Sequence, residues 1–216
     1  MAPEPPLTRL PREFLARETE TVARDLLGVW LVRASPEGLT GGPIVETEAY
    51  GGPTDLASHA RAGRTKRTSV MFGPVGRAYV YLVYGMHECL NVVAYQGRDA
   101  GAVLIRAIEP RLGVDLMRRR RGGRTDPEPR LAAGPARVCQ AMAVTRAFDG
   151  HDLTTDEELW LALPNDGWPA LDVKIGARIG VDYAGEGWRE REWRFWVADS
   201  PSVSTLKGAR NRIAAI

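Results

Sequence analysis

The chain has 216 residues, 44% of them hydrophobic and 26% charged, and a formal net charge of +2. These values are typical of one soluble globular domain with a sizeable core, and they exclude disordered and strongly polyionic chains. No run of about 18 apolar residues is present, so nothing is expected to span a membrane. The proline-rich start, residues 1–6, lacks the apolar core of a signal peptide.

Cysteine and lysine are both scarce. Cys89 and Cys139 are the two cysteines, too few for a disulfide framework and without metal-ligand spacing, which indicates a reduced, cytoplasmic protein. Lysine occurs only at Lys66, Lys174 and Lys207, so the positive charge is nearly all arginine. Arginine suits phosphates and aromatic faces better than lysine does. A composition rich in Ala, Gly and Pro would give the same bias, and both explanations stay open.

We expect a flexible N-terminal lead-in over residues 1–14 and a single domain over residues 15–216. The apolar positions of residues 12–27 predict a helix that stops at Gly28. Residues 29–32 and 43–50 predict two strands of one hairpin, with a turn at Glu37-Gly38.

The strand predicted over residues 43–50 carries unusual side chains for a core strand. Alternate residues share a face, which places Ile44, Glu46, Glu48 and Tyr50 together. A face that is simply solvated would explain two carboxylates at this spacing, because acidic residues are mostly exposed. The next segment, residues 51–70, favours a functional assignment, since so long a polar loop in a compact domain is often functional. It contains His59 and several basic residues.

Three strands follow, over residues 78–84, 89–95 and 102–108. Their short connections require antiparallel pairing, because a parallel crossover needs a dozen residues or more. The sequence therefore predicts a β-meander. Arg106 lies inside its last strand and needs a partner if it is buried, for which a carboxylate on a neighbouring strand is the obvious choice.

The last third of the chain predicts helices and short strands. Residues 111–121 favour a helix ending in four arginines, a run usually typical of a solvated face. Gly134-Pro135 opens a further helix to Val144, with Arg137 in a first turn that could hold a phosphate. Together these elements predict an α+β fold: one domain with a curved, mostly antiparallel β-sheet surrounded by helices. The strand-like stretches here are residues 159–163, 177–181 and 193–197.

No glycine-rich phosphate loop, nucleophile elbow or Cys/His metal cluster is visible, so no metal and no cofactor are expected. The candidates for chemistry are the carboxylates, His59, Arg106 and a set of tyrosines. Aromatic side chains beside a carboxylate can form a slot for a flat ring, where stacking contributes about 1–3 kcal/mol per base. The tyrosines that fall close together are Tyr50, Tyr79, Tyr81, Tyr84 and Tyr95.

Several ordered motifs resemble the alkyladenine (3-methyladenine) DNA glycosylase family. The resemblance covers roughly residues 15–206, and its separate motifs make it far more specific than any single one. They are Val-Glu-Thr-Glu-Ala-Tyr (45–50), Ser-His-Ala (58–60), Met-Phe-Gly-Pro-Val-Gly-Arg-Ala-Tyr-Val-Tyr (71–81), Tyr-Gly-Met-His (84–87), Leu-Asn-Val (90–92), Leu-Ile-Arg-Ala-Ile-Glu-Pro (104–110), Gly-Pro-Ala-Arg-Val-Cys-Gln-Ala (134–141) and Arg-Ile-Gly-Val-Asp-Tyr-Ala-Gly-Glu (178–186).

The resemblance implies a role for each matching residue near the reacting bond. Glu48 would be the general base that activates water, and Arg106 would help to hold that water and carboxylate. Ile179 would touch the water through its backbone carbonyl. Glu46 receives no role from the resemblance and is interpreted as structural.

The resemblance also implies how DNA is held. Tyr50 and Tyr81 would sandwich a flipped base, His59 would bond near the sugar and pack against the base, and Asn91 would crowd the exocyclic amine of guanine. Tyr84 would enter the minor groove as a wedge. Met86 and Arg137 correspond to further DNA contacts, and His87 stands where some relatives carry tyrosine, which leaves the contact with the opposite strand open.

The implied activity is removal of alkylated purines from double-stranded DNA by a cytoplasmic monomer. A damaged base is extruded at a cost of a few kcal/mol, and Glu48 activates the water that attacks the sugar carbon. Since no lysine lies near the Glu48 motif, no strand cleavage is expected. Excision of deaminated or other neutral lesions such as hypoxanthine or ethenoadenine stays open.

Two other functions compete with this one. An ordinary glycosidase could use Glu46 and Glu48 as its acid and base, although such a pair must flank the bond and these two approach from one side. A non-catalytic nucleic-acid-binding sheet could use the tyrosines and arginines alone, which gives Glu48 no role.

Overall fold

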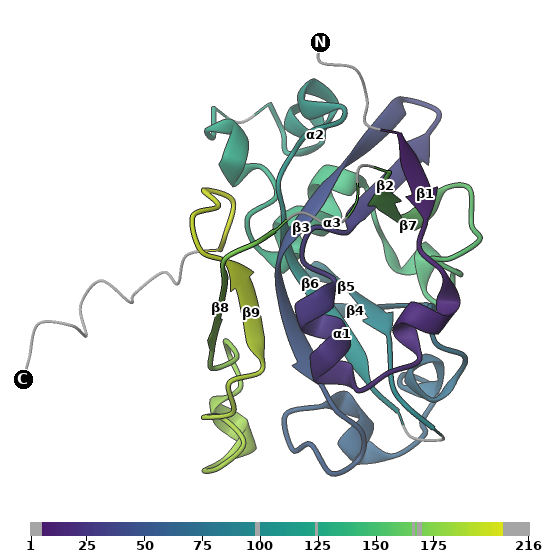
Figure 1. Cartoon of the computed structure of the whole chain (residues 1–216), viewed down its shortest axis with the longest axis vertical. Helices are drawn as coiled ribbons and strands as arrows, with labels where there is room; N and C mark the ends of the chain where they lie inside the picture. Colours follow the sequence, from purple (N-terminus) through teal and green to yellow (C-terminus); the bar gives the residue numbers. More distant parts are fainter. Residues whose placement is uncertain (1–5, 98–99, 124, 166, 168–169, 205–216) are drawn as a thin grey trace, which may run out of the picture.

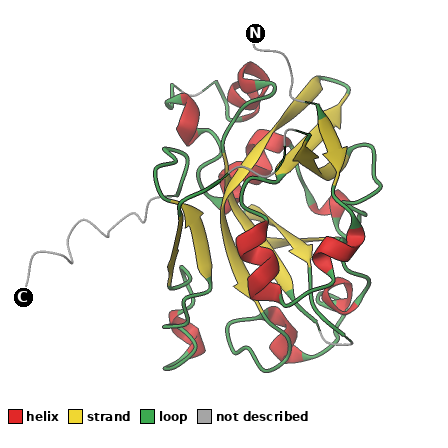
Figure 2. Ribbon diagram, viewed as in Figure 1, coloured by secondary structure: helices red, strands yellow, loops and turns green. Residues whose placement is uncertain are grey.

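The computed structural model describes residues 6–97, 100–123, 125–165, 167 and 170–204. One antiparallel sheet dominates them, and it curls around the helices that cover it (Figures 1 and 2). The main strand order is β1-β7-β2-β3-β6-β5-β4, and β9 joins β3 and β8 at a separate edge. The predicted single α+β domain with a curved, mostly antiparallel sheet is confirmed. The strands are β1 (Leu7–Arg9), β2 (Trp30–Ser35), β3 (Gly38–Tyr50), β4 (Ala78–Val83), β5 (His87–Val93), β6 (Ala102–Ile108), β7 (Leu159–Pro164), β8 (Val173–Gly176) and β9 (Arg194–Val197).

The α-helices of the described residues pack on this sheet, α1 and α3 with the larger contacts and α2 against β3. Figure 1 shows α1 over its centre, where it contacts β3 and β6, while α3 contacts β5 and β6. Among the described residues, every helix is too short or too polar to cross a membrane. The helices are α1 (Thr19–Asp25), α2 (Val114–Arg120) and α3 (Pro135–Met142), and the 3-10 turns are η1 (Arg12–Leu15), η2 (His59–Ala62), η3 (Ser69–Phe72), η4 (Glu128–Arg130), η5 (Arg146–Phe148) and η6 (Asp182–Ala184).

The two faces of the central strands differ in chemistry, as the alternation of side chains requires. One face is apolar and packs against α1 and α3; it includes Val80, Leu90 and Ile105. The predicted hairpin of β2 and β3 and the predicted meander of β4, β5 and β6 are both present. The opposite face of the meander carries Tyr81 and Asn91 and is free to form a site.

A change of register divides β3. Ile44 pairs with Ile108, but Glu46 pairs with Ala107 and the next pair shifts again, leaving Val45 and Arg106 without a directly opposed residue. An inserted residue reverses which face the side chains occupy. Ile44 therefore lies in the core, and its predicted place on the face of Glu46 and Glu48 is wrong.

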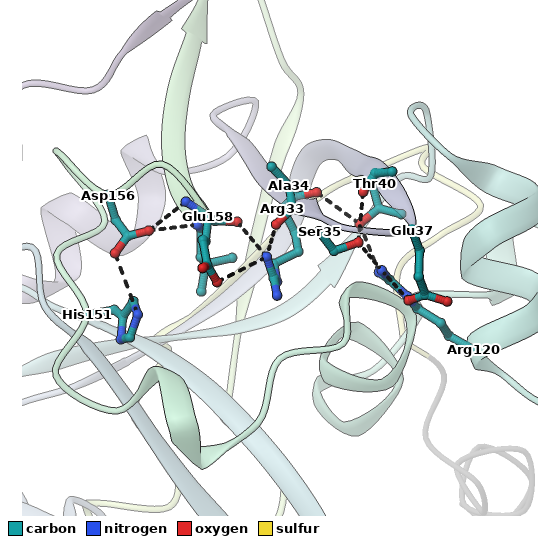
Figure 3. A network of polar contacts seen from close by, with 11 residues as sticks. Arg33, Ala34, Ser35, Glu37, Thr40, Arg120, His151, Asp156 and Glu158 are labelled. Atoms are coloured by element: carbon teal, nitrogen blue, oxygen red, sulfur yellow. Dashed lines mark hydrogen bonds and ion pairs between the residues drawn. The ribbon is translucent and has the colours of Figure 1, made fainter.

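The arginines at the end of α2 are not all a solvated face. The side chain of Arg120 is only 8% exposed. It donates to Ser35 Oγ at 2.7 Å and to Glu37 Oε2 at 3.0 Å, which ties α2 to the turn of the β2–β3 hairpin (Figure 3). Figure 3 shows this link beside the contacts of Arg33 with the segment before β7. Burial of a guanidinium requires such partners, and a lone arginine run does not reveal them.

Three sequence predictions need correction. Residues 7–14 are not a flexible lead-in, because β1 pairs with β7, Leu10 is buried in the core and η1 begins at Arg12. The helix predicted over residues 12–27 is divided into η1 and α1. Residues 177–181 form no strand; the strand that pairs with β9 is β8, which comes just before them.

Candidate active site

A cavity of about 600 Å³ lies on the polar face of the meander. Its walls come from β3, β4, β5 and β6 and from the segments around η2 and η6, which lie far apart in the sequence. Seven of the ten predicted site residues line it: Tyr50, His59, Tyr81, Tyr84, Asn91, Arg106 and Ile179.

Glu48 lies directly behind this lining and is 0% exposed. Its Oε1 accepts a hydrogen bond of 2.7 Å from the backbone N–H of Ile179, and its Oε2 accepts one of 2.8 Å from the hydroxyl of Tyr50. Arg106 Nη1 lies 3.2 Å from the same Oε2. All three neighbours line the cavity, so the carboxylate is fixed at its floor from three directions.

Arg106 bridges the two carboxylates of β3. Its Nε donates to Glu46 Oε1 at 2.8 Å, while its Nη1 faces Glu48. Burial would lower the pKa of Arg106, but Glu48 and Glu46 together raise it. The expected partner on a neighbouring strand is thus confirmed, and there are two of them.

Two tyrosines of the cavity, Tyr50 and Tyr81, are neutral phenols. Burial, followed by the charge of Glu48, raises the pKa of Tyr50 well above its ordinary value. Burial likewise raises the pKa of Tyr81. Each therefore lines the cavity as an aromatic ring without charge, as a slot for a flat ring requires.

His59 is also neutral. Burial, and then the charges of Arg67 and Arg61, lower the pKa of His59 to about 4. Its Nδ1 lies 3.0 Å from the Tyr79 hydroxyl, and its Nε2 lies 3.4 Å from Arg67 Nη2. Because arginine can only donate, Nε2 is the acceptor and Nδ1 carries the hydrogen. The imidazole also meets Tyr81 edge-on, with centroids 4.6 Å apart.

Asn91 is held rigidly in the wall. It is 3% exposed, and its Nδ2 donates to the backbone oxygen of Tyr79 at 3.0 Å. This bond crosses from β5 to β4 and fixes the amide orientation, so its remaining polar atom has a defined direction in the cavity.

A tight turn between β4 and β5 projects at the rim. Tyr84 is 89% exposed and Met86 71%, which is unusual for side chains of this size. Tyr84 adopts φ of 50°, a left-handed conformation that a bulky residue rarely occupies. Tyr84 and His87 line the cavity and Met86 does not.

Arg137 lies outside the cavity lining. Its place in the first turn of α3 is as predicted, next to Pro135 and Ala136, which do line the cavity. Its Nη1 donates to the backbone oxygen of Arg130 at 3.1 Å.

A buried ion pair that sequence reasoning missed fastens the site together. Arg178 donates to both oxygens of Asp55, at 2.6 and 3.0 Å, and the two side chains are 0% and 1% exposed. Arg178 also donates to Ala49 O at 3.0 Å, next to Tyr50. The residue after Arg178 is Ile179, so this pair joins the end of β3 to the segment that contacts Glu48. Asp55 falls in a polar loop and Arg178 in a stretch predicted as strand, and only the position of Arg178 at the start of a recognised motif could have drawn attention to the pair.

Arg194 and Ser204 were missed as well. Arg194 Nε donates to Glu46 Oε1 at 2.8 Å, and Ser204 donates to Glu46 through both its backbone N–H and its hydroxyl. No local pattern links them to Glu46, which is more than 140 residues earlier in the chain.

The chain is also similar in sequence to a known protein family and to several named proteins. Residues 13–201 match the family described as "Methylpurine-DNA glycosylase (MPG)". A protein of Methanocella arvoryzae, provisionally named a 3-methyladenine DNA glycosylase, is 48% identical over 90% of this chain and 95% of its own. The human protein named DNA-3-methyladenine glycosylase is 43% identical over 95% of this chain and 71% of its own.

Proposed function

The chain belongs to the methylpurine-DNA glycosylase family and is a DNA-repair glycosylase, and we propose that it acts on alkylated purines as a monofunctional hydrolase. It flips bases such as 3-methyladenine and 7-methylguanine out of the duplex and hydrolyses the N-glycosidic bond, leaving an abasic site. The observation that carries this proposal is the Glu48 carboxylate, held by three donors at the floor of an aromatic cavity.

In the proposed reaction, Glu48 takes a proton from water as the water oxygen attacks the sugar carbon. The base leaves with the bonding electrons of the N-glycosidic bond. The developing positive charge on the sugar is stabilised by the same carboxylate. Arg106 holds Glu48 in place, and the carbonyl of Ile179 helps to orient the water.

The cavity suits a flat base that carries positive charge. Tyr50 and Tyr81 offer aromatic faces, and such faces attract a cation by roughly 0.5–2 kcal/mol. An alkylated purine that is already cationic leaves readily and needs little acid assistance. Neutral His59 adds no repelling charge near the sugar, and Asn91 crowds the exocyclic amine that distinguishes guanine.

The rim supplies the contacts with duplex DNA. Tyr84 on its exposed turn fills the space that the flipped base leaves, and Met86 and Arg137 contact the DNA beside it. Extrusion costs a few kcal/mol and costs least for a damaged base, which favours lesions over normal bases.

The alternative of an ordinary glycosidase is poorly supported by the geometry. It requires Glu46 as a proton-donating acid. Burial would raise the pKa of Glu46, but Arg106, Arg194 and the Ser204 N–H outweigh burial and lower it. Glu46 is therefore ionised, 0% exposed and absent from the cavity lining.

Strand cleavage is also not part of the proposal. Within the described part of the chain, no lysine lines the cavity, so no amine is placed to form a Schiff base with the sugar.

We further propose that the protein works as a cytoplasmic monomer. Cys89 and Cys139 are both free and buried, as suits a reducing compartment. Light scattering on the purified protein tests the monomer, and a mass of twice 23.7 kDa would contradict it.

The decisive experiment compares wild type with Glu48→Gln on labelled duplexes carrying one lesion, either 7-methylguanine or hypoxanthine, followed by alkali. We expect wild type to leave alkali-labile sites and the variant to lose about 10²–10⁴-fold in excision rate while still binding the lesion. The 7-methylguanine duplex tests the base assignment, and the hypoxanthine duplex shows whether neutral lesions are substrates.

Binding of both duplexes without excision by either protein would contradict the proposed chemistry. Excision by Glu48→Gln at the wild-type rate would contradict only the assignment of Glu48 as the general base, and not the glycosylase activity.

A further inference from the structure

Four charged side chains form one buried cluster beneath the cavity: Glu46, Glu48, Arg106 and Arg194. The carboxylates are 0% exposed, and the side chains of Arg106 and Arg194 are 8% and 13% exposed. The cluster holds two negative and two positive charges, so its formal sum is zero. With so little water nearby, the loss of one charge is felt strongly by the others.

The contacts of Glu46 lead away from the cavity. Its Oε1 accepts from Arg106 Nε and Arg194 Nε, each at 2.8 Å, and its Oε2 accepts from the Ser204 N–H at 2.7 Å. A buried carboxylate is costly unless it is paired and hydrogen-bonded, and the two guanidinium groups and Ser204 meet this requirement for Glu46.

The neighbour it serves is Arg106. The guanidinium has its Nε on Glu46 and its Nη2 on Ser204 Oγ at 3.3 Å. These two bonds occupy the edges of the planar group that face away from Glu48. The remaining Nη1 is thereby aimed at Glu48 Oε2, 3.2 Å away.

From this arrangement we infer that Glu46 and Arg194 are positioning residues for catalysis, which aim Arg106 at Glu48 and set the net charge that Glu48 experiences. The inference rests on the proposed role of Glu48 as general base. Neither residue touches the cavity, so neither is a catalytic residue.

Of the cavity groups near Glu48, His59 gains its proton only near its lowered pKa of about 4, below the pH range of the test. Burial raises the pKa of the neutral hydroxyl and thiol groups, so these stay protonated below neutral pH; Asp55 and Arg178, behind Tyr50, form a pair of opposite charges. Only the cluster members can therefore supply an unbalanced charge. The neutral groups are Tyr50 on β3, Tyr81 on β4, Cys89 on β5 and Tyr183 on η6.

Single neutral substitutions should have opposite effects. Glu46→Gln leaves the surroundings of Glu48 one unit more positive, which favours the charged carboxylate and makes it a weaker base. Arg194→Gln leaves them one unit more negative, which disfavours the charged carboxylate. An added or lost charge within a few ångströms moves the low-pH side of an activity profile by about one pH unit or more.

The test is single-turnover excision of 7-methylguanine from a duplex between pH 4.5 and 9. This lesion is already cationic, so the acid limb of the profile reports the protein. We expect the limb to move to lower pH in Glu46→Gln, to higher pH in Arg194→Gln, and back toward wild type in the double variant. The maximal rate should fall about tenfold or more in Glu46→Gln.

Ser204→Ala is the matched neutral control, because it removes hydrogen bonds to Glu46 and Arg106 without changing charge. It should slow excision without moving the limb. Thermal melting identifies a variant that does not fold; if Glu46→Gln fails, the direction of the Arg194→Gln shift still decides.

The inference would be overturned if the acid limbs of both single variants coincide with that of wild type, or if both limbs move in the same direction. Either result would leave the assignment of Glu48 as the base intact. An active Glu48→Gln, or a wild-type profile without an acid limb, would overturn the base assignment and this inference together.

Discussion

At the scale of single residues, Glu46 and Glu48 show how environment separates two chemically equal groups. They are two positions apart on β3, and both are 0% exposed. Glu46 is enclosed by Arg106, Arg194 and Ser204 and has no path to the cavity. Glu48 is bonded to three groups that themselves line the cavity, so substrate can reach its surroundings.

His59 gives a prediction about pH and stability. Its pKa of about 4 in the fold lies below the ordinary value of 6.5, mainly because burial disfavours the charged ring. The native state therefore binds a proton less readily than the unfolded chain. The stability that neutral His59 contributes is fully present above about pH 6.5 and is lost as pH falls from there to about 4.

Urea unfolding of wild type and His59→Gln across pH 4–8 measures this effect. The difference in unfolding free energy between the two should shrink below pH 6.5, by less than about 1.4 kcal/mol per pH unit because the ring is partly solvated. A difference that stays constant with pH would show that His59 does not carry the shift.

At the scale of elements, the site depends on segments that are distant in sequence and fastened to one strand. The segment before η6 has little regular structure, yet Ile179 must meet Glu48 at 2.7 Å. Arg178 secures it by bonding Asp55 and the end of β3 together. A bidentate pair of this kind fixes orientation as well as distance.

Asp55→Asn should therefore destabilise the protein strongly. Removing one partner of a buried ion pair leaves an uncompensated charge and costs about 3–5 kcal/mol. The matched control is Asp172→Asn, because Asp172 and Lys174 form a pair at 3.0 Å whose side chains are 63% and 54% exposed. An exposed pair contributes only about 0–1 kcal/mol.

Chemical denaturation of both variants gives the two values directly. Excision should also fall in Asp55→Asn at a temperature where it is fully folded, because Ile179 loses its anchor. Equal, small losses of stability in the two variants would refute the stabilising role of the buried Asp55–Arg178 ion pair.

At the scale of the whole molecule, binding to DNA depends on where charge lies rather than on its sum. The net charge is only +2, so long-range attraction to a polyanion is weak. His59 and Arg67 line the cavity, and the loop between them carries Arg64 and Lys66, both exposed. This loop places positive charge next to the rim that we propose as the contact with duplex DNA.

The double variant Arg64→Gln/Lys66→Gln should weaken duplex binding mainly at low salt. Each phosphate contact contributes about 0.9 to the slope of log affinity against log salt, so the slope should decrease by about 2. Fluorescence anisotropy between 50 and 200 mM salt measures it.

Arg24→Gln/Arg119→Gln is a control with the same net charge, since both residues are exposed on helices and neither lines the cavity. An equal loss of slope in the control would mean that net charge, and not the loop, governs binding.

Much of this protein is determined by local sequence. Alternation and short turns predict the β2–β3 hairpin and the meander, because side-chain period and connection length are local properties of the chain. The same alternation places Tyr81, Asn91 and Arg106 on one face. Ordered motifs indicate the family, and the structure brings most of the residues they point to into one cavity.

The tertiary structure alone decides which charges meet. Nothing near Glu46 in the sequence indicates Arg194 or Ser204, and nothing near Asp55 indicates Arg178, because each contact joins segments more than 100 residues apart. The register change at Val45 and Arg106 is equally invisible locally, since it arises from the pairing of two strands. Burial strengthens every electrostatic contact that packing creates. The balance of positive and negative charge at the site is therefore set by the complete fold.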